Sequence, residues 1–451
     1  MLKRLRAWLD GLLRSKFVQD TITLQVGRLV LTAVGFATFV VVARLLGPEQ
    51  YGLYQTALVM HGLLLTFDLT GLGPSTITRL SEAVAARDRL QARDLMGYFL
   101  QMSLLVAVLA GGVAWLFGPR FAHASYGDAY IGELMRVYTL TLFLTPLYQL
   151  VLLTLQSARA MRAYTALENV ASLGESGLRI GAVLLGLGPA GIIAAHLLAA
   201  LLKAVGSAWL YRRWQRRLPD VLPGIGEVLL AARRNSPRPY WRFGLLLAVD
   251  KNLASLFTLL PLQLLGMWAS PTEVGFLRLG LGALSYPALL FDGILANLAA
   301  RLPADVGRRD YLRLQDNFRR VARWIVWLSL GVFGTFALAA PLIIPLLGAE
   351  YVPTIPLVRV LCLYGAITGV GGIFGPLYRT LRLMRAILAV KLAALALAAL
   401  PAAWLILSYR SLGGAWAVNL VYTISLVLTV AMTWPQLRRR AREQQAAEGR
   451  A

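Results

Sequence analysis

Long apolar runs dominate the sequence and restrict the chain to one broad class of fold. A helix that crosses a lipid bilayer needs about 20 predominantly apolar residues, and twelve runs of about that length follow one another here. They cover residues 21–44, 51–75, 95–118, 133–157, 163–187, 189–211, 242–268, 273–299, 322–346, 354–378, 384–408 and 412–435. Only 15% of the 451 residues are charged and the mean hydropathy is +0.63, whereas soluble domains carry about 25% charged residues. We therefore predict an all-α integral membrane protein with twelve transmembrane helices.

Positive charges gather on alternate connections between these runs. Clusters of Arg and Lys follow the second, sixth and eighth runs, at residues 79–93, 212–234 and 301–320, while isolated arginines such as Arg44 and Arg120 lie on the opposite side. Cytoplasmic loops of membrane proteins are enriched in Lys and Arg. The pattern predicts a multi-pass protein of the inner (plasma) membrane with both termini in the cytoplasm. It also accounts for the net charge of +23 without nucleic acid as a partner.

The two halves of the chain repeat one sequence pattern. The turn at residues 47–52 returns at 270–275, and Phe67-Asp68 returns as Phe291-Asp292, which is a displacement of 292 − 68 = 224 residues. Because each half contains an even number of runs, both halves enter the membrane in the same orientation. This is a parallel repeat, which in transporters relates two lobes by an axis along the membrane normal. We predict two six-helix lobes with a cavity at their interface.

Polar segments mark the boundaries of these lobes. The longest polar stretch contains four prolines and separates the halves, and leucines at helical spacing between cations predict an interfacial amphipathic helix at the N-terminus. The predicted domains are residues 1–20 (cytoplasmic interfacial helix), 21–211 (N-terminal six-helix lobe), 212–241 (cytoplasmic linker), 242–436 (C-terminal six-helix lobe) and 437–451 (cytoplasmic tail).

The stretch that follows the first run resembles a known family. Residues 46–54, Leu-Gly-Pro-Glu-Gln-Tyr-Gly-Leu-Tyr, and 68–73, Asp-Leu-Thr-Gly-Leu-Gly, are similar to motifs of Wzx-type polysaccharide biosynthesis flippases of the multidrug/oligosaccharidyl-lipid/polysaccharide exporter superfamily. The resemblance implies a bacterial protein that moves an undecaprenyl-pyrophosphate-linked oligosaccharide from the cytoplasmic to the periplasmic leaflet, for a surface polysaccharide such as O-antigen or exopolysaccharide. The implied partners are this lipid-linked oligosaccharide, membrane lipid, and polysaccharide polymerase and assembly proteins.

Charged residues inside the apolar runs are the candidate site, because a charge at the bilayer centre costs about 2.5–3.5 kcal/mol on insertion scales. Arg28 and Lys251 occupy matching positions in the two halves (251 − 28 = 223). Both side-chain types bind phosphate groups, so they are the expected contacts of a pyrophosphate, with snorkelling to the cytoplasmic interface as the alternative. Asp68 and Asp292 also match, and they are candidates for ion coupling or for a structural role.

Further charged residues at membrane depth receive roles from their neighbours in sequence. Glu175 and Arg179 lie four residues apart, on one helix face, and are expected to pair, with lining of the cavity beside Glu168 as the alternative. Asp250 is a candidate to neutralise its neighbour Lys251. Lys203 is close enough to the basic run at residue 212 to snorkel, and Lys391 is expected to snorkel. The candidate substrate-binding residues are Arg28, Arg179, Lys203, Lys251 and Arg278, and the candidate coupling or structural acids are Asp68, Glu175, Asp250 and Asp292.

Several kinds of chemistry have no motif in the sequence. The three histidines share no metal-ligand spacing, no phosphate-binding Gly-rich loop with a Lys-Ser/Thr occurs, and the outer loops are too short for a catalytic domain. We expect no catalytic residue, no metal and no cofactor beyond a coupling ion, H⁺ or Na⁺. Tyrosines near the outer helix ends, among them Tyr51, Tyr54 and Tyr351, are expected in an interfacial belt. The alternatives to a flippase are a cation-coupled multidrug exporter of the same superfamily, a membrane-embedded enzyme acting on lipid-linked sugars, and a non-transporting scaffold for polysaccharide assembly.

Overall fold

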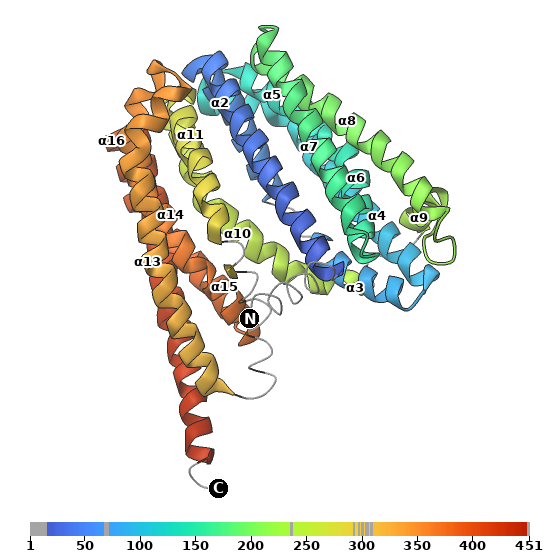
Figure 1. Cartoon of the computed structure of the whole chain (residues 1–451). Coiled ribbons are helices and arrows are strands. Elements are labelled where there is room, and N and C mark those ends of the chain that lie inside the picture. The colour runs from blue at the N-terminus through green and yellow to red at the C-terminus, as the bar shows by residue number, and fades with distance from the viewer. Residues whose placement is uncertain are drawn as a thin grey trace, which may run out of the picture. The chain divides into compact units, whose positions relative to one another are not determined.

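The computed structural model describes residues 16–66, 72–234, 238–291 and 310–448, together with positions 294–295, 298, 302 and 306. These residues form helices joined by short turns, and no strand occurs among them (Figure 1). Helices suit such apolar stretches because an α-helix satisfies its backbone hydrogen bonds internally, as a lipid environment requires.

The first half of the chain begins with a helix that is broken near its middle. α2 (Lys16–Leu65) is kinked at Gly47, whose φ of 70° lies in the left-handed region that glycine adopts without strain. α2 therefore contains the first two predicted runs. The helices that follow are α3 (Leu72–Ala85), α4 (Arg89–Tyr126), α5 (Ala129–Thr139), α6 (Thr141–Ser157), α7 (Met161–Leu184), α8 (Gly188–Gln215) and α9 (Ile225–Arg234).

The second half ends with a helix that is broken in the same way. α16 (Met384–Glu448) is interrupted at Arg410, with φ 50° and ψ −124°, and contains the last two predicted runs. The elements before it are α10 (Arg238–Trp268), α11 (Pro271–Ala288), the 3₁₀ turn η1 (Leu289–Phe291), α13 (Tyr311–Ile343), the 3₁₀ turns η2 (Ile344–Leu347) and η3 (Ala349–Thr354), α14 (Ile355–Gly372) and α15 (Phe374–Thr380).

These helices confirm the predicted all-α fold class with twelve spans. Eight segments of the described chain are long and apolar enough to cross a membrane. Two of them, Val30–Leu65 and Met384–Ala446, each contain two runs separated by a kink. α7 and α10 contain two further runs, so the total is 8 + 2 + 2 = 12.

The chain forms two compact units. Unit 1 comprises the described residues within Met1–Leu46, Asp68–Ala122 and Ala129–Ala248, and unit 2 those within Gly47–Phe67, His123–Asp128 and Val249–Ala451. The second run of the first half, in α2, thus belongs to the same compact unit as the second half of the chain.

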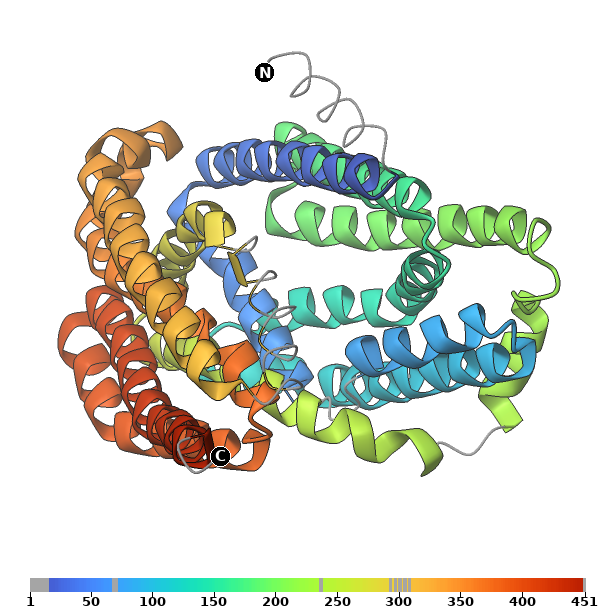
Figure 2. The ribbon, with the colours of Figure 1, turned by 60° about the horizontal axis from the view of Figure 1, so that its bottom comes forward.

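Each unit is organised around one central helix. In unit 1, α8 packs against α5, α6 and α7, and a core cluster includes Leu95, Met96 and Leu155. In unit 2, α14 packs against α11, α13 and α16, and α13 and α16 lie side by side (Figure 2). The core there includes Phe318 and Leu377.

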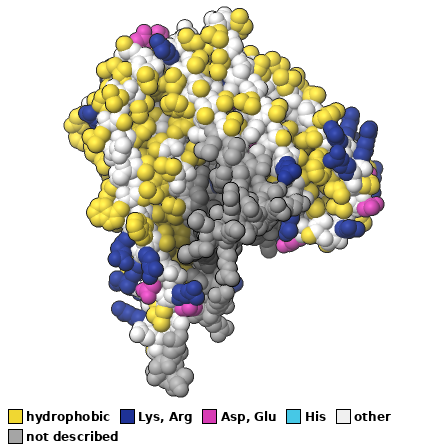
Figure 3. Space-filling model, in the orientation of Figure 1, with side chains coloured by type: hydrophobic (Ala, Val, Ile, Leu, Met, Phe, Trp, Pro, Cys, Tyr) yellow, Lys and Arg dark blue, Asp and Glu magenta, His cyan; other side chains and the backbone are white. Residues whose placement is uncertain are grey.

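Large apolar side chains also cover the outer surface of the helices. Leu338 and Leu342 of α13 are 80% and 77% exposed, and Leu400 of α16 is 83% exposed. Hydrophobic side chains spread widely over the face shown in Figure 3, where Lys and Arg gather toward the helix ends. Soluble monomers rarely expose contiguous apolar surface of this kind, so these side chains face lipid. The molecule is a multi-pass membrane protein.

The two copies of the repeated turn contact each other inside unit 2. A Cβ atom on Gly52 would lie 2.3 Å from the carbonyl oxygen of Pro271, and one on Gly275 would lie 2.9 Å from Gly52 Cα. The glycines of this motif therefore serve close packing of two backbones.

The tyrosines expected in an interfacial belt instead pack in the core of unit 2. Tyr51 and Tyr351 are 3% and 1% exposed, and their rings meet edge to face with centroids 6.5 Å apart. Tyr54 is buried as well. The prediction of a lipid-interface position is wrong for these three residues, because the turn that carries Tyr51 and Tyr54 is covered by the repeated turn and by η3.

Candidate substrate-binding site

A half-buried carboxylate joins two helices of unit 1. Glu175 of α7 accepts from the Lys203 ammonium of α8 through Oε2, and its Oε1 lies 3.0 Å from His196 Nδ1. His196 and Lys203 are seven residues apart, so they lie on the same face of α8. The ammonium also lies 5.5 Å from the ring centroid of Tyr148 in α6, which is within range of a cation–π interaction. The carboxylate and the ammonium balance each other, and three helices meet at this cluster.

The predicted pairing of Glu175 with Arg179 is therefore wrong. Both residues lie on a suitable face of α7, but packing of α8 against α7 brings two other partners to the carboxylate. Arg179 Nε is buried and has no hydrogen-bond partner among the described residues. Lys203 does not snorkel either, because its ammonium is held inside unit 1 and only 18% of its side chain is exposed.

A second carboxylate, which is buried, organises the charges of unit 2. Asp250 of α10 accepts from Lys391 Nζ of α16, at 2.5 Å through Oδ1 and at 2.9 Å through the backbone carbonyl. Tyr378 Oη donates to Asp250 Oδ2 at 3.3 Å, and Arg379 Nη2 lies 3.7 Å from the same oxygen. Lys251, the next residue along α10, is exposed. One carboxylate is thus surrounded by more than one positive charge.

Two predictions for this region are wrong. Lys391 was expected to snorkel and instead binds Asp250, with 13% of its side chain exposed. Asp250 was expected to neutralise Lys251, but successive residues point about 100° apart on a helix. The carboxylate therefore points into unit 2, and no ionic partner of Lys251 occurs among the described residues.

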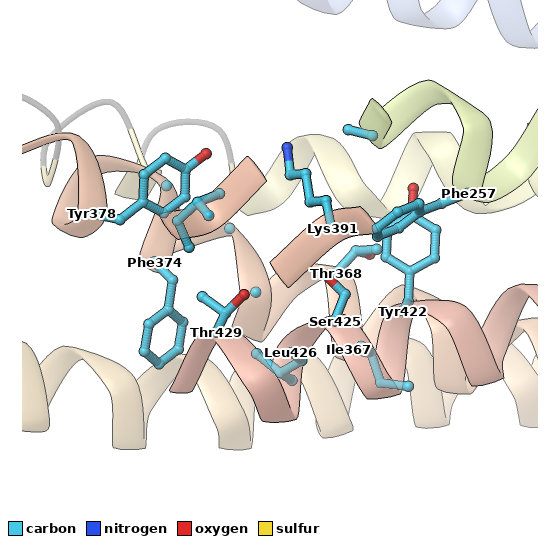
Figure 4. A pocket seen from close by; sticks show the side chains of 15 residues that line it. Phe257, Ile367, Thr368, Phe374, Tyr378, Lys391, Tyr422, Ser425, Leu426 and Thr429 are labelled. Carbon is cyan, nitrogen blue, oxygen red and sulfur yellow. The ribbon is translucent and has the colours of Figure 1, made fainter. Parts of the chain in front are cut away.

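A cavity of about 280 Å³ opens beside this second cluster, between α10, α14, α15 and α16. Lys391 and Tyr378 form part of its wall, so the carboxylate cluster and the cavity share two side chains. Aromatic rings and hydroxyl groups line much of the remainder (Figure 4). The residues that carry them are Phe257, Thr368, Phe374, Tyr422, Ser425 and Thr429.

The other predicted site residues lie apart from the two clusters or outside the described part of the chain. Arg278 of α11 is half-buried and donates through Nε to Gln55 Oε1 of α2 at 3.3 Å. The side chain of Arg28 lies outside the described residues. The adjacent Gly27 packs α2 against α7, since a Cβ atom there would lie 2.5 Å from Thr165 Cγ2. Asp68 and Asp292 lie outside the described residues.

Sequence reasoning missed His196, Tyr378 and Arg379 as members of these clusters. His196 could have been found by its seven-residue spacing from Lys203, whereas no local pattern links α15 to Asp250. Within the described residues, no group of three His, Cys, Asp or Glu side chains could hold a metal ion.

The fold is similar to that of solved membrane transporters. A multidrug resistance MATE family transporter of the MOP superfamily, solved in an inward-facing conformation, has a TM-score of 0.71 at 17% identity and covers 91% of this chain and 95% of its own. A second structure, of a MATE family transporter of the MOP superfamily in an outward-facing conformation, has a TM-score of 0.63 at 18% identity. The match covers 97% of this chain and 98% of the transporter. A MOP superfamily transporter from Pyrococcus furiosus, described as having a binding pocket of reverse polarity, has a TM-score of 0.64 at 15% identity. The match covers 95% of this chain and 98% of that transporter. At these identities the likeness shows the fold.

No curated protein matches the chain in sequence. A family model does match it: the model described as "Polysaccharide biosynthesis protein" aligns with residues 17–297, which is more than half of the chain. With the MOP-type transporter fold and this match, the chain belongs to the polysaccharide biosynthesis protein family.

Proposed function

We propose that the protein is a flippase that moves a polyprenyl-pyrophosphate-linked oligosaccharide from the cytoplasmic to the periplasmic leaflet of the bacterial inner membrane. Transport proceeds by alternating access and serves the biosynthesis of a surface polysaccharide. The family match and the transporter fold support this function. The prenyl tail stays in lipid while the pyrophosphate and sugars cross within the protein.

The observation that carries the proposal is the excess of positive charge around Asp250. Lys391 and Arg379 share this one carboxylate. Asp250 can balance only one of these two cations, so the cluster carries a net positive charge that favours an anionic ligand. A pyrophosphate supplies that opposite charge, and it accepts hydrogen bonds from both ammonium and guanidinium groups.

Individual roles follow from this assignment. Lys251 and its counterpart Arg28 are the proposed contacts of the pyrophosphate. Arg179, Lys203 and Arg278 are further substrate contacts along the path. A coupling ion, H⁺ or Na⁺, supplies the energy, with Asp68, Glu175, Asp250 and Asp292 as the candidate acids.

The test is flipping of a fluorescent undecaprenyl-pyrophosphate oligosaccharide in proteoliposomes under an imposed ion gradient. Wild type should flip the lipid, and Arg28→Ala/Lys251→Ala should not. The matched control is Arg439→Ala, which removes a 78%-exposed arginine that pairs with Glu443. Normal flipping by the double variant would refute the assignment of these two cations. If wild type flips the lipid with none of the glycans, the proposed flippase function is wrong.

A cation-coupled multidrug exporter is the second candidate, because transporters described as multidrug resistance proteins share the fold. An exporter of cationic drugs needs acids to dominate its site, and the cluster around Asp250 has the opposite balance. Gradient-driven uptake of ethidium by the same proteoliposomes, without flipping of the lipid-linked oligosaccharide, would favour this function. Sugar-bond formation by the purified protein would favour an enzyme, and polymerase binding without transport would favour a scaffold.

A further inference from the structure

We infer that the cavity of unit 2 is a sugar-binding subsite, which holds the first sugar of the lipid-linked oligosaccharide next to its pyrophosphate. This inference rests on the proposed function and adds to it a recognition site for the glycan within the C-terminal half of the chain. The cavity is the one that Lys391 and Tyr378 share with the Asp250 cluster.

Two hydroxyl groups in the cavity wall have no hydrogen-bond partner among the described residues. Ser425 and Thr429 lie one turn apart on α16, and both line the cavity. Serine and threonine in a helix usually bond the carbonyl one turn earlier, as Thr433 does with the Thr429 carbonyl at 2.7 Å. The Ser425 and Thr429 hydroxyls do not make this bond, so each can donate one hydrogen bond to a ligand and accept others.

Lys391 offers a third donor to the same space. An ammonium group has three N–H bonds, and its hydrogen bonds within the described residues go to the carbonyl and the carboxylate of Asp250. Because Lys391 also lines the cavity, one N–H is left for a sugar hydroxyl or a phosphate oxygen. Arg379, 58% exposed, lies on the other side of the carboxylate.

Aromatic rings enclose the polar groups. Figure 4 shows Phe374 and Tyr378 toward one end of the cavity and Phe257 and Tyr422 toward the other, with Ser425 and Thr429 between these ends. Phe257 and Tyr422 meet edge to face with centroids 5.2 Å apart, which keeps both rings in place. This arrangement suits a pyranose. The aromatic rings can pack against its apolar C–H faces, and the Ser425 and Thr429 hydroxyls can bond the hydroxyl groups at its edge.

Size and polarity favour a single sugar ring over a whole oligosaccharide or a lipid chain. Ligand pockets usually measure about 300–1,000 Å³, so a cavity of about 280 Å³ holds one sugar ring rather than a whole oligosaccharide. A prenyl or acyl chain would bury the two hydroxyls and the ammonium without hydrogen bonds, which is unfavourable. The edge of the cavity that carries Lys391 is the edge where the pyrophosphate is proposed to bind.

The test measures binding of two lipids to the full-length protein in nanodiscs. One is bare undecaprenyl pyrophosphate, and the other carries a single sugar, taken from a panel of hexoses and N-acetylhexosamines. Wild type should bind one of the glycosylated lipids more tightly than the bare one. Ser425→Ala and Thr429→Val each remove one hydroxyl and keep most of the side-chain shape. Each should lower the affinity for the preferred glycosylated lipid about fivefold, which corresponds to the loss of one hydrogen bond. The affinity for the bare lipid should not change.

Three controls make the result specific. Thr433→Val removes a hydroxyl that bonds its own helix and should bind both lipids as wild type does. Thr429→Ser keeps the hydroxyl and should retain the preference. Gly371→Leu places a side chain in the cavity from a position where a Cβ atom meets only Leu426 Cδ1, at 4.0 Å, and should abolish the preference while leaving bare-lipid binding intact.

The outcomes separate this inference from the function on which it rests. A wild type that binds the bare lipid as tightly as every glycosylated lipid overturns the sugar subsite, and so do Ser425→Ala and Thr429→Val variants with wild-type preference. Both results leave the flippase to the transport assay. A wild type that binds neither lipid overturns the proposed function, and the sugar subsite with it.

Discussion

Both compact units contain a carboxylate that binds a lysine, half-buried in unit 1 and buried in unit 2, but at positions that the sequence repeat does not relate. Glu175 corresponds to Ala398 in the second half (175 + 223 = 398), and Asp250 corresponds to Gly27 in the first (250 − 223 = 27). Each pair therefore arose within its own half. The repeat accounts for the shared helix order, whereas the charged residues distinguish the two halves chemically.

The surroundings of the two carboxylates differ as well. In the Glu175 cluster, Lys203 lies against the ring of Tyr148 and the charges of the pair cancel. The Asp250 cluster is positive and adjoins a cavity. The two clusters thus differ in net charge and in their access to a cavity. Three measurements of stability test this contrast.

The largest effect is expected for Asp250→Ala. The substitution leaves the Lys391 ammonium, 13% exposed, without its counter-charge, and an uncompensated buried charge costs about 3–5 kcal/mol. The free energy of unfolding, measured by dodecyl sulfate titration, should fall by about that amount. Asp250→Ala/Lys391→Met removes the stranded charge and should regain most of the loss. A double variant as unstable as the single one would contradict the pairing.

A smaller loss, about 1–3 kcal/mol, is expected for Glu175→Gln. The amide keeps the shape of the carboxylate and one acceptor, and Lys203 keeps its contact with Tyr148. A double-mutant cycle between Glu175 and Lys203 should show coupling, and one between Glu175 and Arg179 should show none, because the carboxylate binds α8 instead. A loss larger than that of Asp250→Ala would reverse the comparison between the units.

The smallest effect is expected for Tyr148→Leu, which removes the ring beside Lys203 but keeps the Glu175 salt bridge. Cation–π contacts contribute about 0.5–1 kcal/mol at partly exposed sites, and the free energy of unfolding should fall by about that much. Tyr148→Phe keeps an aromatic face and should be close to wild type in the same titration. Equal losses for the leucine and phenylalanine variants would assign the effect to the phenol hydroxyl instead.

Local patterns in the sequence predict contacts along one helix, and these were the least successful expectations. The four-residue spacing of Glu175 and Arg179 is suitable for a pair, yet α8 supplies two better partners. Asp250 and Lys391 are 141 residues apart, so no local spacing could have joined them. The buried tyrosines Tyr51 and Tyr351 show the same limitation, because a residue near a helix end can face lipid or a neighbouring helix.

The membrane-spanning class, the twelve helices, the repeat and the family resemblance all follow from the amino-acid sequence alone. Each crossing of a bilayer requires about 20 apolar residues, so the hydropathy of the sequence shows the crossings directly. The tertiary structure was needed to show which charges meet. It also showed that Ser425 and Thr429 line a cavity, where their hydroxyls have no hydrogen-bond partner among the described residues. The physical reason is that a helix presents several polar residues on several faces, and its rotation and packing against other helices select which of them come into contact.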